Sequence, residues 1–130
     1  MTQEEEKNLL LKDLCTRLPY GVRYRHFTWN DEYGETYIAA QIYSINTDGY
    51  VKNCYDDETV YIDNVRPYLF PLSSVTDEQK EEYQYIIERW MYDSSYSISD
   101  ITDWLNKNHF DYRGLIEKGL AIDATGLNIY

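Results

Sequence analysis

Hydrophobic positions with a helical period come first along the chain. Leucines recur at steps of three and four residues up to Leu18, so they share one side of a helix. Thr2 and Glu5 have the spacing of a capping box, in which two side chains bond backbone N–H groups of the first turn. A stop signal follows at Pro19, which cannot continue a helix. The pattern predicts a helix over residues 3–17.

From residue 22 to residue 70 the period of the hydrophobic positions falls to two. Runs rich in β-branched and aromatic residues begin at Val22, Thr36 and Val60, and clusters of turn residues separate them. Asp48-Gly49 is a strong hairpin signal, because glycine accepts the positive φ that primed turns require. These runs predict four or five short antiparallel strands, arranged as a meander or a small barrel with one solvated face.

The helical period returns after the predicted sheet. Thr76 and Gln79 have a second capping-box spacing, and the apolar stripe that follows them predicts a helix over residues 77–92. Trp90 lies on this stripe, and Trp104 lies on the stripe of the next helical segment. Both tryptophans are therefore expected in the core.

Two shorter helices are expected to complete the chain. The first begins at Ser97 or Ser99 and has Ile98 facing the core. The second lies within residues 111–120 and is capped by Asp111. Together these elements predict an α+β fold, in which an N-terminal helix, an antiparallel sheet and a helical subdomain of two to three helices pack together.

The predicted elements form one domain over residues 1–130. No repeat or low-complexity linker divides the chain, and its length is that of one domain. Residues 121–130 form a tail without a strong period.

Tyrosine and acidic residues add a prediction about the surface. The chain has 15 Tyr in 130 residues and a formal net charge of −11, of which residues 28–65 carry −7. Tyrosine combines an apolar ring with a polar hydroxyl, which suits a surface that meets a partner. The negative charge repels a phosphate backbone and attracts a basic surface. A protein partner with a basic surface is therefore expected, whereas duplex nucleic acid is disfavoured.

The expected contact surface is an acidic, tyrosine-rich face of the sheet and its turns. Trp29 lies in a turn-rich segment and is the tryptophan expected to be partly exposed. The predicted binding residues are Tyr24, Trp29, Asp31, Glu32, Tyr33, Tyr37, Tyr43, Tyr50, Tyr55, Asp56, Asp57, Glu58 and Tyr61.

Motifs for catalysis, cofactor binding or metal binding do not stand out, so no catalytic residue, cofactor or metal ligand is predicted. His26 and His109 are interpreted as structural, the latter as an imidazolium at a helix C-terminus. Cys15 is interpreted as a small core residue. Cys15 and Cys54 are expected to be free thiols, although one disulfide between them stays open. The acidic run at residues 56–58 is interpreted as a solvated turn.

The N-terminal segment is acidic where a signal peptide would be basic. No apolar run approaches the length of about 18 residues that spans a bilayer. A cytoplasmic location without membrane contact is expected.

Three long motifs resemble a family of small uncharacterised proteins encoded by phages and prophages of gut anaerobic bacteria. They are LLLKDLCTRLPYGV (residues 9–22), VRPYLFPLSSVT (residues 65–76) and DWLNKNHFDYRGLIEKGLA (residues 103–121). The resemblance covers the two ends of the chain, whereas residues 23–60 depart from it. It implies a bacterial host cytoplasm and a phage accessory role, and it implies no catalytic residue.

These observations favour a non-enzymatic phage accessory protein that binds a host or phage protein through the acidic, tyrosine-rich sheet face. Antagonism of a defence protein or of nucleic-acid machinery is one version, with carboxylates in place of phosphates. An ordinary acidic surface without mimicry stays open. Two alternatives also remain, namely a small metal-assisted enzyme that uses Asp56, Asp57 or Glu58 with His26, and a homo-oligomeric structural protein.

Overall fold

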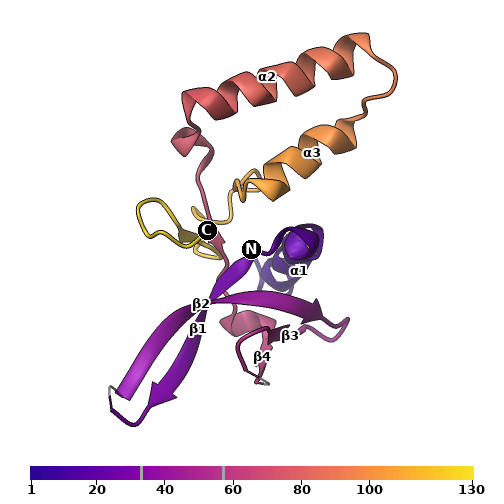
Figure 1. The fold of residues 1–130 in the computed structure, drawn as a ribbon. Coiled ribbons are helices and arrows are strands. Elements are labelled where there is room, and N and C mark those ends of the chain that lie inside the picture. Colours follow the sequence, from indigo (N-terminus) through magenta and orange to yellow (C-terminus); the bar gives the residue numbers. More distant parts are fainter. Residues whose placement is uncertain (33, 57) are drawn as a thin grey trace.

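The computed structural model in Figure 1 describes residues 1–32, 34–56 and 58–130 and confirms the predicted α+β fold. An N-terminal helix packs on a curled antiparallel sheet, and a helical hairpin follows. The elements are α1 (Gln3–Arg17), β1 (Arg23–Asn30), β2 (Gly34–Ile45), β3 (Tyr50–Asn53), β4 (Thr59–Tyr61), β5 (Tyr68–Leu69), α2 (Asp77–Tyr92), α3 (Ile98–Lys107) and β6 (Ile122–Asp123).

The N-terminal helix α1 has the predicted bounds, and of the two bonds of the predicted capping box the structure shows the one that Thr2 accepts. The Thr2 hydroxyl accepts a hydrogen bond from the backbone N–H of Glu5 at 3.1 Å. Leu10 and Leu14 are buried against the sheet, which is the role that the leucine periodicity predicts. Gly21 ends the segment in the left-handed conformation, with φ +73°, which lets the chain turn into β1.

The main sheet has the order β1-β2-β3-β4, and every neighbouring pair is antiparallel. The predicted Asp48-Gly49 turn joins β2 to β3. The hydrophobic core lies between this sheet, α1 and the C-terminal loops. Its buried members are Leu10, Leu14, Val22, Tyr24, Ala40, Ile42, Val51, Ile62, Val65, Leu69, Leu115, Leu120 and Ala121.

Strands β1 and β2 continue beyond this core as a two-stranded ribbon (Figure 1). They pair from Arg23 opposite Gln41 to the turn that joins them. In the described ladder, β3 pairs with β2 only from Ile42 onward. The outer part of the ribbon, residues 27–30 and 34–37, is called the ribbon tip below.

The C-terminal half begins with the predicted helix α2, whose Thr76–Gln79 capping box is formed in both directions. Helix α3 follows from Ser97, and the two helices make a hairpin above the sheet (Figure 1). The expected tail also contains an unpredicted strand, because β6 pairs with β5 in parallel.

The third predicted helix is wrong, because residues 111–120 form turns. The predicted cap itself exists, since the Asp111 carboxylate accepts the backbone N–H groups of Leu115 and Ile116 at 2.8 and 2.9 Å. Gly114 has φ +72°, which interrupts a right-handed helix at this point. The chain turns there, and Leu115 and Leu120 enter the core.

The predicted burial of Trp90, Ile98 and Cys15 is also wrong, and that of Trp104 is only partly confirmed. Trp90 is 44% exposed and Ile98 is 67% exposed, because the helical hairpin has only part of its surface against the rest of the chain. Trp104 is half-buried and stacks on Phe110, with ring centroids 5.6 Å apart. Cys15 is exposed, since it lies about 100° around α1 from the buried Leu14. Cys15 and Cys54 are both free thiols, as expected.

Candidate functional site

The outer face of the ribbon tip carries a group of exposed aromatic rings. Phe27 and Tyr37 are cross-strand partners, and their rings meet edge to face with centroids 5.8 Å apart. Trp29, two residues further along β1, lies on the same face and is 67% exposed, as expected. Phe27, Trp29 and Tyr37 are called the aromatic patch below. Arg25 borders the patch, with its guanidinium 4.9 Å from the centre of the Tyr37 ring.

The inner face of the same strand carries a polar cluster built around His26. Strand alternation turns Tyr24 and His26 inward, and both are buried. The Nε2 atom of His26 lies 2.9 Å from Asp56 Oδ2 and 3.5 Å from Glu58 Oε2. Its Nδ1 atom lies 2.9 Å from the Tyr24 hydroxyl. Tyr24, His26, Asn53, Asp56 and Glu58 are called the His26 cluster below.

Asn53 at the end of β3 brings Asp56 back to His26. Its side-chain oxygen accepts the backbone N–H groups of Tyr55 and Asp56, both at 2.8 Å, so the loop turns around it. Its Nδ2 donates to the Tyr24 hydroxyl at 2.9 Å and to Asp56 Oδ1 at 3.2 Å. The sequence prediction omitted Asn53. An Asn at a strand end, followed by an acidic turn, was the available signal.

The Asp56 carboxyl is held in its ionised form. Burial raises its pKa, but hydrogen bonds from His26, from the backbone N–H of Glu58 and from Asn53 outweigh burial, so the pKa lies below its usual value. When the His26 ring is neutral, the bonds run in one direction. Asn53 donates to Tyr24, the Tyr24 hydroxyl donates to Nδ1, and Nε2–H donates to Asp56.

A cavity of about 410 Å³ lies beside the His26 cluster. His26 and Glu58 form one part of its wall, and the cationic side chains of Arg25 and Arg66 also line it. Phe27 and Tyr37 of the aromatic patch line the cavity as well. The cavity therefore combines a histidine, a carboxylate and two cations with aromatic rings, which is a composition suited to ligands with both a polar or anionic group and an apolar part.

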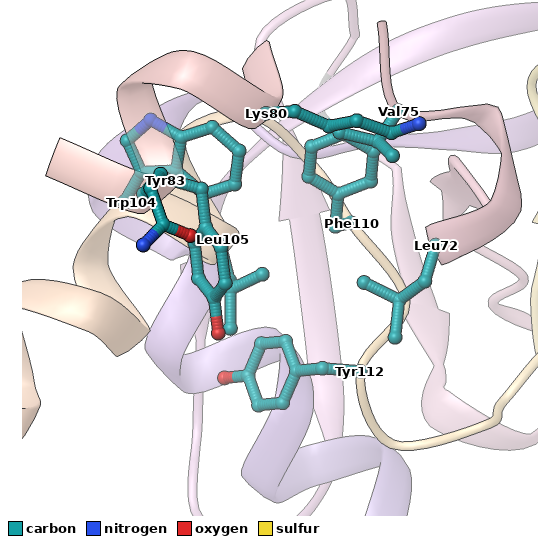
Figure 2. Close-up of a pocket in the computed structure, with 9 residues that line it drawn as sticks. Leu72, Val75, Lys80, Tyr83, Trp104, Leu105, Phe110 and Tyr112 are labelled. Atoms are coloured by element: carbon teal, nitrogen blue, oxygen red, sulfur yellow. The ribbon is translucent and has the colours of Figure 1, made fainter. Parts of the chain in front are cut away.

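A second cavity, of about 530 Å³, lies under the helical hairpin (Figure 2). Figure 2 shows Tyr83, Trp104, Phe110, Tyr112 and Leu72 arranged around it. The Tyr83 and Trp104 rings are 5.3 Å apart. The Lys80 side chain is the cation among the lining residues, so this cavity offers apolar contact rather than acid–base chemistry.

The predicted binding residues do not share one face. Trp29, Asp31, Glu32 and Tyr37 belong to the ribbon and its turn, and all four are exposed. Exposed Tyr50 and half-buried Tyr61 are cross-strand neighbours on β3 and β4, and their rings meet edge to face with centroids 5.4 Å apart. Tyr43 and Tyr55 are exposed elsewhere on the sheet and its loop, and Asp56 and Glu58 turn toward His26.

The prediction that Tyr24 belongs to the binding surface is wrong. Tyr24 has no exposed area and belongs to the hydrophobic core, so it cannot contact a partner. The neighbours in sequence, Arg23 and Arg25, face the opposite side of the strand. Tyr33 and Asp57, also predicted to bind, lie outside the described residues.

Two further findings are a search for membrane-spanning helices and a comparison with known proteins. In the described part of the chain, none of the helices combines the length and apolar character that crossing a membrane requires. Comparison with protein-family models, with curated proteins and with solved structures found no match to this chain.

Proposed function

We propose that this chain is a non-enzymatic binding protein that holds a protein partner through its ribbon tip. The observation that carries the proposal is the aromatic patch, in which Phe27, Trp29 and Tyr37 are 44%, 67% and 57% exposed. Large rings exposed side by side leave apolar area in water, and such groups mark interaction surfaces. Tryptophan and tyrosine also dominate the energetics of protein interfaces.

The charges around the patch favour a basic partner. Asp31 and Glu32 lie in the turn of the ribbon, and Glu35 pairs across the strands with Trp29. The whole chain carries a formal net charge of −11, which speeds the approach of a basic surface at low ionic strength. Arg25, beside Tyr37, gives the patch one cationic border that an acidic group of the partner can meet.

We also propose, from the resemblance of three motifs to phage proteins, that the protein acts in a bacterial cytoplasm. There the partner would be a host or phage protein, and a defence or nucleic-acid-handling protein would offer the basic surface. The carboxylates at the ribbon turn would then stand where phosphates normally bind. The departure of residues 23–60 from the family pattern supports this proposal, because the ribbon lies within that segment.

Affinity capture with matched variants tests the proposal. The immobilised chain and its Trp29→Ala/Tyr37→Ala variant are exposed to host lysate, and the captured protein is then purified and titrated. We expect the dissociation constant to rise at least about 30-fold in the variant, because one interface hot spot contributes about 2 kcal/mol. The control is Tyr85→Ala/Tyr92→Ala, which removes two exposed rings from α2 and should leave binding unchanged.

A charge variant separates the roles of rings and acids. Glu35→Gln should slow association and flatten its dependence on salt, with little change in dissociation. Asp31 is kept, because its carboxylate accepts a hydrogen bond from Trp29 Nε1 at 3.3 Å. Equal capture by the wild type and the Trp29→Ala/Tyr37→Ala variant would contradict the proposal.

A homo-oligomer is a second candidate function, favoured by a different surface. Trp90, Met91, Tyr92 and Ile98 are all exposed around the turn between α2 and α3. Light scattering over a range of concentrations decides this alternative. A monomer at every concentration, or a dimer that persists in Trp90→Ala/Tyr92→Ala, would exclude self-association through this surface.

A further inference from the structure

We propose that His26, Asp56 and Glu58 form a binding site for a first-row transition-metal dication such as Zn²⁺. Each residue offers one ligand atom, and the three atoms all lie within 4.8 Å of one another. The residues come from two segments about 30 positions apart, and the fold brings them together at the edge of the sheet. This site does not depend on the proposed partner.

The spacing of the ligand atoms fits a small metal ion. Two ligands bound at about 2.0–2.2 Å from a tetrahedral ion lie about 3.3–3.6 Å apart. The 3.5 Å separation of His26 Nε2 and Glu58 Oε2 already matches this value. The 2.9 Å separation of Nε2 and Asp56 Oδ2 needs an opening of about 0.5 Å, which a half-buried loop residue can provide.

Hydrogen bonds from neighbouring side chains orient the proposed ligands, as they do in known metal sites. Tyr24 bonds His26 Nδ1, and the hydroxyl can either donate to this atom or accept from it. With a metal on Nε2, the imidazole proton moves to Nδ1 and donates to the Tyr24 oxygen, which fixes the ring orientation. Asn53 donates to the Asp56 oxygen that does not face His26, so the other oxygen stays directed at the site.

The three ligand side chains differ in their exposure to solvent. The side chains of His26, Asp56 and Glu58 are 3%, 29% and 70% exposed. The buried imidazole is thus the fixed ligand, and the exposed glutamate can close over an arriving ion. His26 and Glu58 also line the 410 Å³ cavity, so a small ligand in the cavity would lie next to a bound ion.

The donor set selects the class of metal. One imidazole nitrogen and two carboxylate oxygens suit Zn²⁺, Co²⁺ or Mn²⁺, whereas Ca²⁺ and Mg²⁺ prefer sites made of oxygen alone. The two carboxylates also neutralise the charge of a dication. Arg25 and Arg66 on the cavity wall then favour an anion, rather than a cation, as a further ligand to the metal.

Calorimetric titration with Zn²⁺ alone tests the site. The wild type and a Cys15→Ser/Cys54→Ser variant are both titrated, because exposed thiols also bind zinc. We expect one ion per chain in both proteins, and Co²⁺ should give the visible absorption of a nitrogen and oxygen site. Glu58→Gln changes an exposed side chain and should fold, and it should weaken binding at least about tenfold, as even the loss of a supporting partner does.

Two further variants make the test specific. Glu35→Gln, an exposed carboxylate on the opposite strand face, is the matched control and should bind Zn²⁺ like the wild type. Tyr24→Phe should weaken binding by about 10-fold to 100-fold, because Nδ1 loses its partner. Absence of Zn²⁺ binding, binding that ends when the cysteines are replaced, or equal binding in Glu58→Gln would each overturn the proposal.

Discussion

The imidazole of His109 lies flat against the ring of Tyr130, with ring centroids 3.6 Å apart and an angle of 10° between the planes. His109 is buried after the end of α3, where its φ of +61° places it in the left-handed region. Burial, followed by repulsion from Arg17 and Arg23, lowers its pKa from 6.5 to about 4. The interpretation of His109 as an imidazolium is therefore wrong, because the ring is neutral at pH 7.

This neutral histidine predicts a loss of stability in mild acid. Above pH 6.5 the ring is neutral in both the folded and the unfolded chain. Between pH 6.5 and pH 4 the unfolded chain takes up a proton that the folded chain refuses, so the free energy of unfolding falls as the pH falls. The full loss from His109 is on the order of 3 kcal/mol. Urea unfolding at several pH values between 7 and 4 measures it.

His109→Asn is the matched variant, because asparagine tolerates positive φ and does not titrate. It should be less stable at pH 7, where it lacks the stacked ring, but its stability should fall less steeply toward pH 4. Parallel pH profiles for the two proteins would show that His109 does not control the acid response.

A buried ion network should make Asp13 one of the most sensitive positions. Asp13 and Arg17 have no exposed area, and Arg17 Nε donates to Asp13 at 2.8 Å. Arg113 donates to the other carboxylate oxygen, also at 2.8 Å. We expect Asp13→Ala to lower the free energy of unfolding by about 3–5 kcal/mol, since two cations lose their partner in the interior. Exposed Asp48→Ala is the control, and a loss under 1 kcal/mol at Asp13 would contradict the expectation.

The Tyr24 hydroxyl should stabilise the fold independently of any ligand. Tyr24→Phe keeps the buried ring but leaves Asn53 and His26 without this hydrogen-bond partner. The expected cost is about 1–3 kcal/mol, the penalty for buried polar groups that lose a bond. Thermal unfolding of metal-free protein measures it. Tyr55→Phe, at an exposed site, should have no effect, and equal melting temperatures for the two variants would refute the assignment.

Gly49 should resist substitution because of close packing as well as conformation. Its φ is +91°, and a Cβ atom there would lie 3.2 Å from atoms of Ile62, Lys7 and Tyr61. Gly126 also has positive φ, at +77°, but no described neighbour lies within 4 Å of its Cβ position. Both alanine variants should lose about 1 kcal/mol from backbone strain, and Gly49→Ala should lose more. Equal losses in urea unfolding would mean that the packing around Gly49 relaxes.

Local signals in the sequence predicted the elements that depend on local bonds. The caps at Thr2 and Thr76 and the Asp48-Gly49 turn each use residues within four positions, and all three occur. The helix predicted within residues 111–120 does not form. The cap at Asp111 is present, but Leu115 after it contacts the core, whose residues are distant in the sequence. Local spacing carries no information about such contacts.

In the candidate sites, too, the features set by local sequence were predicted and those set by distant contacts were not. Strand alternation separates Tyr24 from Tyr37 in the sequence, but only the position of α1 decides which of the two faces is buried. The His26 cluster joins residues about 30 positions apart through the turn at Asn53. The tyrosines and acidic residues of the sheet segment were expected on one face of the sheet. Strand alternation and the turns instead distribute them over several surfaces.

Helix α2, all of whose residues are described, has none that is buried. Its backbone is therefore held mainly by its own hydrogen bonds and by partial contact with α3, whereas α1 and the sheet share the core. Free energy is distributed unevenly in such a chain, and the helical hairpin is the cooperative unit that opens first. Amide hydrogens of α2 should exchange with deuterium through local opening long before those of β2.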